Sequence, residues 1–198
     1  MSLIFFIKSS TVNIKNYTIK DIPGSSGRLD VISRCILAAL LRNNDFEDNI
    51  QIWVFLEKLG TYIFDTKLLD YNSFPKNELK LTEYFVDLIR KKEEGTEIED
   101  NPLNRVKSSY MTIFEALRYF LKIDAKAFIL NENGEHSSNF LHKIKNNKMN
   151  FVFVIGDQSG NLIKSKGLRD MKLPNVCLGN KSYLASSIIR LIKLLVIY

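Results

Sequence analysis

The sequence predicts an α/β fold with a mostly parallel sheet flanked by helices. Short, fully apolar runs bounded by polar or glycine-containing breaks have the length of buried strands. Stretches with apolar residues at helical spacing separate several of these runs, which is the pattern of a sheet with crossover helices. A chain of 198 residues suffices for one well-buried core, so we expect residues 1–198 to form a single domain.

The N-terminal half alternates between the two patterns. Its predicted strands are LIFFIK (3–8), IQIWVFL (50–56) and an edge strand, TYIFD (61–65). Its predicted helices are RLDVISRCILAALL (28–41) and KNELKLTEYFVDLIRKKEE (76–94), and Gly95 ends the second of these. Residues 95–109 have little periodicity and contain Asn101 and Pro102, so they predict a loop.

The C-terminal half repeats the alternation with shorter elements. We expect helices at 110–122, 137–147 and 181–198, strands at 125–130, 151–155 and 175–178, and a turn in NENGE (131–135). The last helix is apolar on most of its faces and therefore needs a partner surface, either in its own chain or in a second copy.

Ligands of such folds bind at the carboxyl ends of the parallel strands. Three loops then become candidates: NENGE after the strand at 127–130, GDQSG after 151–155 and LGNKS after 176–178. Gly156, at the start of the second loop, would let a ligand approach the backbone, although a glycine there is also common in plain turns.

Composition excludes several kinds of site. Cys35 and Cys177 lie 142 positions apart without a CxxC spacing, so we expect no disulfide framework and no zinc site, which fits a reducing cytoplasm. His136 and His142 have no carboxylate at ligand spacing, and we expect no bound metal. The sequence contains neither GxxxxGK[ST] nor GxGxxG, so a phosphate-cradling nucleotide loop has no support.

Charge and hydropathy limit the kinds of partner that we expect for this chain. The 28 basic and 22 acidic residues give a net charge of +6, which suits a polyanion such as nucleic acid without requiring one. Arg105 and Lys107, beside the irregular loop, are the basic residues that we expect to contact phosphate. The apolar run LIFFI is short, and SSIIRLIKLLVIY is interrupted by Arg190 and Lys193, so we expect no membrane span.

The stretch DIPGSSGRLDVISRC (21–35) places two arginines around an aspartate. Pro23 and Gly24 predict a turn, Ser25 or Ser26 predicts a helix cap, and Asp30 and Arg34 are spaced for an i,i+4 ion pair. These features are equally consistent with an ordinary capped helix and with a set of fixed charges that binds a ligand.

Together, GSSGRLDVISRC, ILNENGE, FVFVIGDQSG and CLGNKSYLASS, which occur in that order before a terminal helix, resemble the archaeal tRNA pseudouridine-54 N1-methyltransferases of the SPOUT superfamily. The resemblance implies a C-terminal trefoil knot, bound S-adenosyl-L-methionine, a tRNA T-loop substrate, and a cytoplasmic homodimer whose two chains share each active site. The residues that would line the cofactor by matched position are Leu130, Gly134, Ile155, Gly156, Asp157, Cys177, Leu178, Tyr183, Leu184 and Ala185.

The reaction that the resemblance implies suits the charges of the GRLD stretch, so we expect Arg28, Asp30 and Arg34 to be the catalytic residues. Methyl transfer to a ring nitrogen requires alignment and a route for the N1 proton, and no covalent nucleophile. The arginines would then grip phosphate or uracil carbonyl oxygens, while Asp30 orients the base or receives the proton.

Two departures from the family pattern leave alternatives open. The segment NPLNRVKSS offers Lys107 and Ser108 where the family has a paired arginine, and Ile188 stands where the family has a cysteine in the final helix. A ribosome-biogenesis methyltransferase acting on pseudouridine in rRNA, or a knotted RNA-binding protein without catalysis, are the alternative functions.

Overall fold

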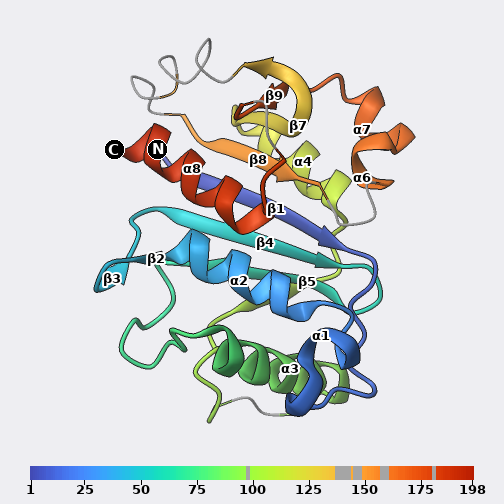
Figure 1. Ribbon diagram of the computed structural model, residues 1–198, viewed down its shortest axis with the longest axis vertical. Coiled ribbons are helices and arrows are strands. Elements are labelled where there is room, and N and C mark those ends of the chain that lie inside the picture. The colour runs from blue at the N-terminus through green and yellow to red at the C-terminus, as the bar shows by residue number, and fades with distance from the viewer. Residues whose placement is uncertain (97–98, 137–143, 145–148, 157–160, 180–181) are drawn as a thin grey trace.

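The computed structural model describes residues 1–96, 99–136, 144, 149–156, 161–179 and 182–198. Within these residues a seven-stranded sheet has the order β6-β5-β4-β1-β8-β7-β9 (Figure 1). Its strands are β1 (Leu3–Ser9), β4 (Ile50–Leu56), β5 (Gly60–Asp65), β6 (Lys107–Ser109), β7 (Lys126–His136), β8 (Phe151–Ile155) and β9 (Asn175–Cys177). Parallel pairing joins five consecutive strands of this order, β4-β1-β8-β7-β9, which confirms the predicted fold class.

Helices cover both faces of the sheet (Figure 1). Successive residues of β1 point to opposite faces, so Phe5 joins one apolar cluster and Phe6 the other. The first cluster includes residues of α2 (Leu29–Leu40), α3 (Glu78–Glu94) and α8 (Ala185–Ile197). The second includes residues of α4 (Ile113–Lys122), α6 (Asn161–Lys164) and α7 (Lys166–Asp170). Burial on both faces explains why the central strands are continuous apolar runs.

Three local features differ from the sequence prediction, and one predicted helix lies almost wholly outside the described residues. β5 is not an edge strand, because Lys107–Ser109 of the predicted loop forms β6 and pairs with it. The chain also forms short elements with little periodicity: η1 (Ile19–Asp21), α1 (Ile22–Ser25) and the hairpin of β2 (Leu41–Arg42) with β3 (Asp45–Phe46). The terminal helix begins at Ala185 rather than at 181. Of the helix expected at 137–147, only residue 144 lies within the described residues.

The expected turn at 131–135 is instead part of β7. This strand pairs with β9 twice, because Leu130 and Glu135 both lie opposite Val176. Residues 131–134 therefore form an irregularity within the strand, and strand pairing resumes after it. The prediction of a turn was wrong in type, but it identified where the chain leaves regular pairing.

A buried lysine ties the terminal helix to the end of α2. The Lys193 ammonium donates to the carbonyl oxygens of Ala38, Ala39 and Leu41 at 3.1, 3.0 and 2.8 Å, and it lies 3.4 Å from a Glu47 carboxylate oxygen. These carbonyls lie at the C-terminal end of α2, where they lack helical partners. Burial lowers the pKa of Lys193, and Glu47 opposes that shift. The contact fixes α8 beside α2.

Replacing Lys193 with methionine should destabilise the fold, because Glu47 is buried and would lose its ammonium partner. We expect Lys193→Met to lower the free energy of unfolding by about 3 kcal/mol, as for other broken buried ion pairs. Chemical denaturation measures this value, and Lys92→Met on exposed α3 surface is the control. Equal unfolding energies for the two variants would contradict the anchoring role.

Candidate functional site

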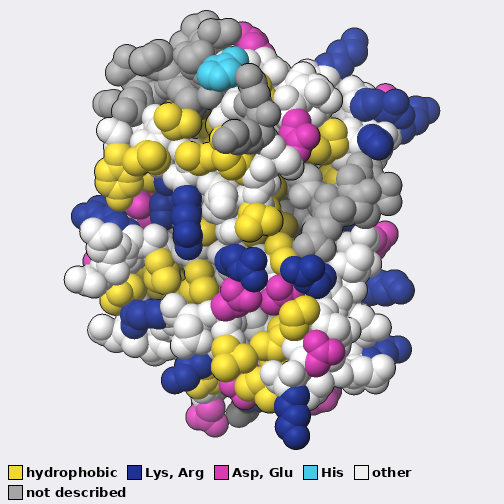
Figure 2. All heavy atoms as spheres, viewed as in Figure 1, with side chains coloured by type: hydrophobic (Ala, Val, Ile, Leu, Met, Phe, Trp, Pro, Cys, Tyr) yellow, Lys and Arg dark blue, Asp and Glu magenta, His cyan; other side chains and the backbone are white. Residues whose placement is uncertain are grey.

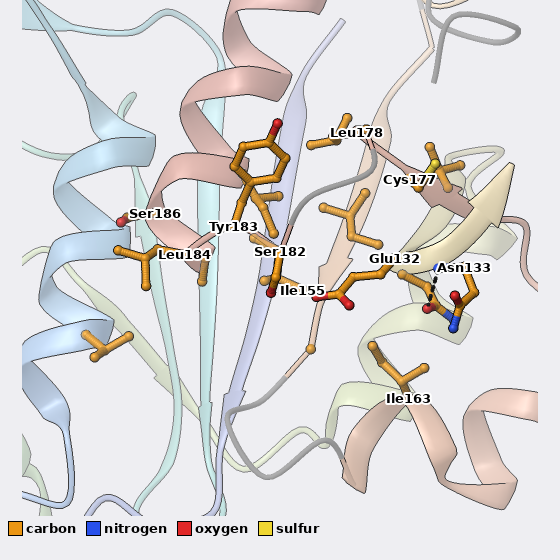
Figure 3. Close-up of a pocket in the computed structure, with 18 of the residues that line it drawn as sticks. Glu132, Asn133, Ile155, Ile163, Cys177, Leu178, Ser182, Tyr183, Leu184 and Ser186 are labelled. Carbon is orange, nitrogen blue, oxygen red and sulfur yellow. Dashed lines mark hydrogen bonds between the residues drawn. The ribbon is translucent and has the colours of Figure 1, made fainter. Parts of the chain in front are cut away.

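A cavity of about 600 Å³ lies at the carboxyl ends of β8, β7 and β9, next to the N-terminal part of α2 and the start of α8 (Figure 3). Its lining comes from chain segments that are far apart in sequence. The described lining residues are Arg28, Val31, Arg34, Leu130, Asn131, Glu132, Asn133, Ile155, Gly156, Ile163, Val176, Cys177, Leu178, Gly179, Ser182, Tyr183, Leu184, Ala185, Ser186 and Ile188. This volume is within the range of small-molecule sites in proteins.

The turn before α2 fixes the backbone position from which the Arg28 side chain extends. Gly27 and Arg28 both have left-handed backbone conformations, with φ of 61° and 72°. A side chain at position 27 would overlap the carbonyl oxygen of Thr11, so only glycine fits there. The N-cap of α2 is Arg28, without a side-chain cap bond, so the expectation that Ser25 or Ser26 caps the helix was wrong. The Ser26 hydroxyl nevertheless accepts from the Leu29 amide, the first of the helix, at 3.0 Å. A non-glycine residue in this conformation carries backbone strain, and such residues concentrate at functional sites.

A chain of charges then holds both arginines in place. The Asp30 carboxylate accepts from Nε and Nη2 of Arg28 at 3.1 and 3.3 Å, and it lies 3.6 Å from Nη2 of Arg34. Arg34 in turn donates from Nε and Nη2 to Glu78 of α3 at 2.9 and 3.0 Å. The hydrogen bonds to Glu78 raise the pKa of Arg34. The Asp30 side chain is only 7% exposed, whereas those of Arg28 and Arg34 are 48% and 37% exposed.

The irregular part of β7 supplies a second wall. The Asn133 amide donates to Oδ1 of Asn131 at 3.1 Å, and between them Glu132 extends toward the cavity (Figure 3). A Cβ on Gly134 would come within 2.6 Å of backbone atoms of Asn175 and Val176. Gly134 therefore permits close approach of β7 to β9, and it does not line the cavity.

The third wall is the segment that follows β9 and leads into α8. Leu178, Ser182, Tyr183 and Leu184 lie along it in Figure 3. Leu184 is 67% exposed and Tyr183 is 39% exposed, which is unusual for large apolar side chains that have no ligand or partner to cover them. The wall is thus mostly apolar, and the hydroxyls of Ser182, Tyr183 and Ser186 are its polar side-chain groups.

A smaller hollow adjoins the cavity at the carboxyl end of β1. It shares Arg28, Val31, Gly156 and Ala185 with the larger cavity, and Ser9, Thr11 and Cys35 add to its lining. Burial raises the pKa of the Cys35 thiol to about 12, so the thiolate is not available near neutral pH. The hollow therefore offers hydroxyl groups, the Arg28 guanidinium and the Lys8 side chain, but no thiolate.

Most of the residues expected from the sequence meet at this cavity. Those that line it are Arg28, Arg34, Leu130, Ile155, Gly156, Cys177, Leu178, Tyr183, Leu184 and Ala185. Asp30 lies beneath the two arginines, and Asp157 lies outside the described residues. Arg105 and Lys107 are not brought to it, because they lie at and before β6, at the opposite edge of the sheet from β9.

Sequence reasoning missed several lining residues and one supporting residue. Glu132 lies in the stretch expected as a turn, where carboxylates are ordinarily solvated, and Ser182 and Ser186 carry no signal beyond being close to the third predicted loop. Glu78 lies 44 positions from Arg34, so only the packing of α3 on α2 reveals their contact. Ile188, which we noted as a departure from the family, lines the cavity.

Two absences hold for the described part of the chain. It contains no group of three or more histidine, cysteine, aspartate or glutamate side chains that could hold a metal ion. Among the same residues, no helix combines the length and the apolar character that crossing a bilayer would need.

Comparisons with known proteins agree with this geometry. The model of a protein family described as "Putative SAM-dependent RNA methyltransferase" matches residues 1–196. The tRNA (pseudouridine(54)-N(1))-methyltransferase of Thermococcus gammatolerans is 28% identical over 199 residues, covering 96% of this chain and 94% of the relative. The enzyme of the same name from Methanococcus maripaludis is 30% identical over 163 residues, covering 79% of this chain and 78% of the relative.

A solved structure shares the fold. The crystal structure of Archaeoglobus fulgidus Nep1 bound to S-adenosylhomocysteine aligns with a TM-score of 0.60 and 13% sequence identity, and the alignment covers 100% of both chains. At this identity the similarity concerns the fold.

Two glycine substitutions should distinguish a glycine that packing requires from a glycine that leaves space for a ligand. Gly134→Ala is expected to lower the free energy of unfolding by about 1–3 kcal/mol, because its methyl group meets rigid backbone of β9. Gly156→Ala should cost less, since the methyl group meets only the end of the flexible Ile163 side chain, 2.9 Å away. Chemical denaturation of both variants tests the order, and a larger loss for Gly156→Ala would contradict it.

Proposed function

Because the chain belongs to the family of SAM-dependent RNA methyltransferases, we propose that it methylates N1 of pseudouridine at position 54, in the T-loop of tRNA, with S-adenosylmethionine as the methyl donor. The observation that carries the proposal is the position of the cavity. Three strand ends and a pair of anchored arginines enclose one space, large enough for a small molecule and a nucleobase side by side.

The residues present suit S-adenosylmethionine. Position 156 has no Cβ, so a ligand can reach the backbone at the end of β8, and apolar side chains of Leu130, Ile155 and Leu178 flank that point. Glu132 adds a carboxylate for the hydroxyl or amino groups of the ligand. With S-adenosylmethionine bound, the site would contain a methyl group activated by a sulfonium centre.

The chemistry requires one bond to form as another breaks. The N1 atom of the base forms a bond to the methyl carbon as the carbon–sulfur bond breaks, S-adenosylhomocysteine leaves, and the N1 proton passes to water or to a nearby acceptor. The protein's part is to align the base and to exclude competing geometries. No covalent nucleophile is needed, in keeping with the protonated Cys35 thiol beside the cavity.

We assign the alignment to Arg28 and Arg34. Each guanidinium is held at Nε and Nη2 by a carboxylate. No other described residue accepts from Nη1, so this group can donate toward a carbonyl oxygen or a phosphate. Such fixed donors stabilise negative charge that develops on the base as N1 loses its proton. Asp30 already accepts hydrogen bonds on both oxygens, so we assign it to holding the arginines.

The proposal includes a cytoplasmic homodimer with a C-terminal trefoil knot, as the resemblance implies. Leu194 and Tyr198 at the end of α8 are 59% and 60% exposed, and a second chain would cover them. If two chains share each active site, Arg105 and Lys107 could contact RNA at the partner's site, although they are remote from the cavity of their own chain.

The first test measures methyl transfer directly. The purified protein should transfer label from S-adenosylmethionine to tRNA that carries pseudouridine at position 54, and not to the same tRNA with uridine there. S-adenosylhomocysteine should also raise the melting temperature. Binding without transfer to any RNA would favour the non-catalytic alternative, and transfer to rRNA but not to tRNA would favour the ribosomal one.

The second test concerns Asp30. Asp30→Asn removes the charge that holds Arg28 and Arg34, so we expect kcat to fall about 100-fold, as for small misplacements of reacting groups. The dissociation constant of S-adenosylhomocysteine should change little, because Asp30 does not line the cavity.

Glu83→Gln on the exposed face of α3 is the control for loss of one carboxylate. Unchanged turnover in Asp30→Asn would contradict the positioning role. Loss of both turnover and ligand binding, with a lower melting temperature, would assign Asp30 to the stability of the fold instead.

A further inference from the structure

We infer that four exposed basic residues, Lys164 on α6, Lys166 and Arg169 on α7, and Lys172 just after α7, form a surface that binds the phosphate backbone of the RNA substrate. We call these residues the α6–α7 surface. The inference rests on the proposed function for the identity of the polyanion, and it adds a place where the RNA is held outside the cavity.

The α6–α7 surface concentrates charge. Residues 161–172 contain four basic residues against one acidic residue, Asp170, so this short segment carries a net charge of +3, half of the +6 of the whole chain. Figure 2 shows dark blue side chains gathered at the upper right, where α7 lies in Figure 1. A lysine-rich surface of this kind attracts a polyanion and gives up counterions on binding it.

We find no acidic partner for these cations among the residues that the structure describes. All four are exposed, and no ion pair or side-chain hydrogen bond involves any of them within the described residues. By contrast, Arg28, Arg34 and Lys193 each lie against a carboxylate. Binding a phosphate at the α6–α7 surface therefore breaks no existing ion pair.

Buried residues hold the α6–α7 surface against the rest of the protein. Leu162 and Leu168 are 2% and 0% exposed and belong to the apolar cluster beneath the sheet. Gly167 lies against Phe114 of α4, since a Cβ there would be 2.9 Å from the ring. α7 is thus held on α4, while the four basic side chains are exposed.

Position links this surface to the cavity. Ile163 lines the cavity, and Lys164 is the next residue along the chain. A nucleotide whose base enters the cavity leaves its flanking phosphates outside it, and α6 is one of the elements that border the cavity. Phosphate contacts there would orient the RNA without reading its sequence.

Arg105, which the sequence analysis expected to contact phosphate, has surroundings that are less favourable for a phosphate. Arg105 donates to the Leu68 carbonyl oxygen at 3.4 Å and lines a hollow with Asp70, Glu99 and Asp100. Its positive charge helps to lower the pKa of Asp70, behind the hydrogen bonds from Ser73 and Asn72. Three carboxylates near one guanidinium disfavour a phosphate, so the α6–α7 surface is the stronger candidate in the single chain.

The test compares two triple variants that remove equal charge. One carries Lys164→Gln, Lys166→Gln and Arg169→Gln. The control carries Lys67→Gln, Lys80→Gln and Lys92→Gln, which are exposed and without ion pairs in the described chain. Lys172 is left unchanged because its φ of 49° makes the backbone sensitive to substitution. Binding to pseudouridine-54 tRNA is measured across salt concentrations, together with KM, kcat and the dissociation constant of S-adenosylhomocysteine.

We expect the α6–α7 variant to raise KM for tRNA at least tenfold and to reduce the slope of log Kobs against log salt by about 2, since each lost phosphate contact removes roughly 0.7–0.9. The value of kcat at saturating tRNA and the affinity for S-adenosylhomocysteine should stay unchanged. The control variant should keep the slope of the parent protein.

Equal slopes for the α6–α7 variant and the control would overturn the inference, because the effect would then be one of net charge alone. A parent protein that binds tRNA but does not methylate it would overturn the proposed function instead. In that case the comparison of slopes still decides whether the α6–α7 surface holds the RNA.

Discussion

Parallel pairing of β1, β8, β7 and β9 is the constraint on which the site depends. Strands that run in the same direction end at the same edge, so Ile155, Leu130 and Cys177 come together although up to 47 positions separate them in the sequence. The carboxyl ends of these strands therefore fix the backbone positions around the cavity, whatever the side chains are. Lys193 adds to this order, because it fixes α8, which closes the third side of the cavity, against the end of α2.

The sequence predicted what depends on periodicity and failed where contacts between distant segments decide. Continuous apolar runs identified the central strands, because burial on both faces selects such residues. β6 was missed, since Lys107–Ser109 is polar and is a strand only through its pairing with β5. The irregular part of β7 read as a turn because Asn131, Asn133 and Gly134 are turn residues, and only the second pairing with Val176 makes it part of a strand.

The candidate site divides in the same way. The loops at the strand ends could be predicted from fold class, and most residues that the family resemblance assigned to the cofactor do line the cavity. Gly134 was expected there by its matched position in the family, but the structure gives it a packing reason, the close approach of β9. Glu78 could not be found, because nothing local in its sequence links it to Arg34. Its bidentate contact connects α3 to the arginine pair and makes the position of α3 matter for the site.

The two sets of basic residues differ in how they are held, and the difference suits two tasks. Arg28 and Arg34 are fixed by carboxylates at Nε and Nη2, so their remaining donors point in set directions, as alignment of a single planar base requires. The lysines of the α6–α7 surface are not paired within the described chain, and a flexible lysine delivers charge without a set direction. Phosphates along an RNA backbone vary in position, so an adaptable charge binds them at lower cost than a rigid fork. The fixed arginines at the cavity and the unpaired lysines beside it therefore meet one requirement. A single base must be placed accurately, while the rest of the RNA need only be held.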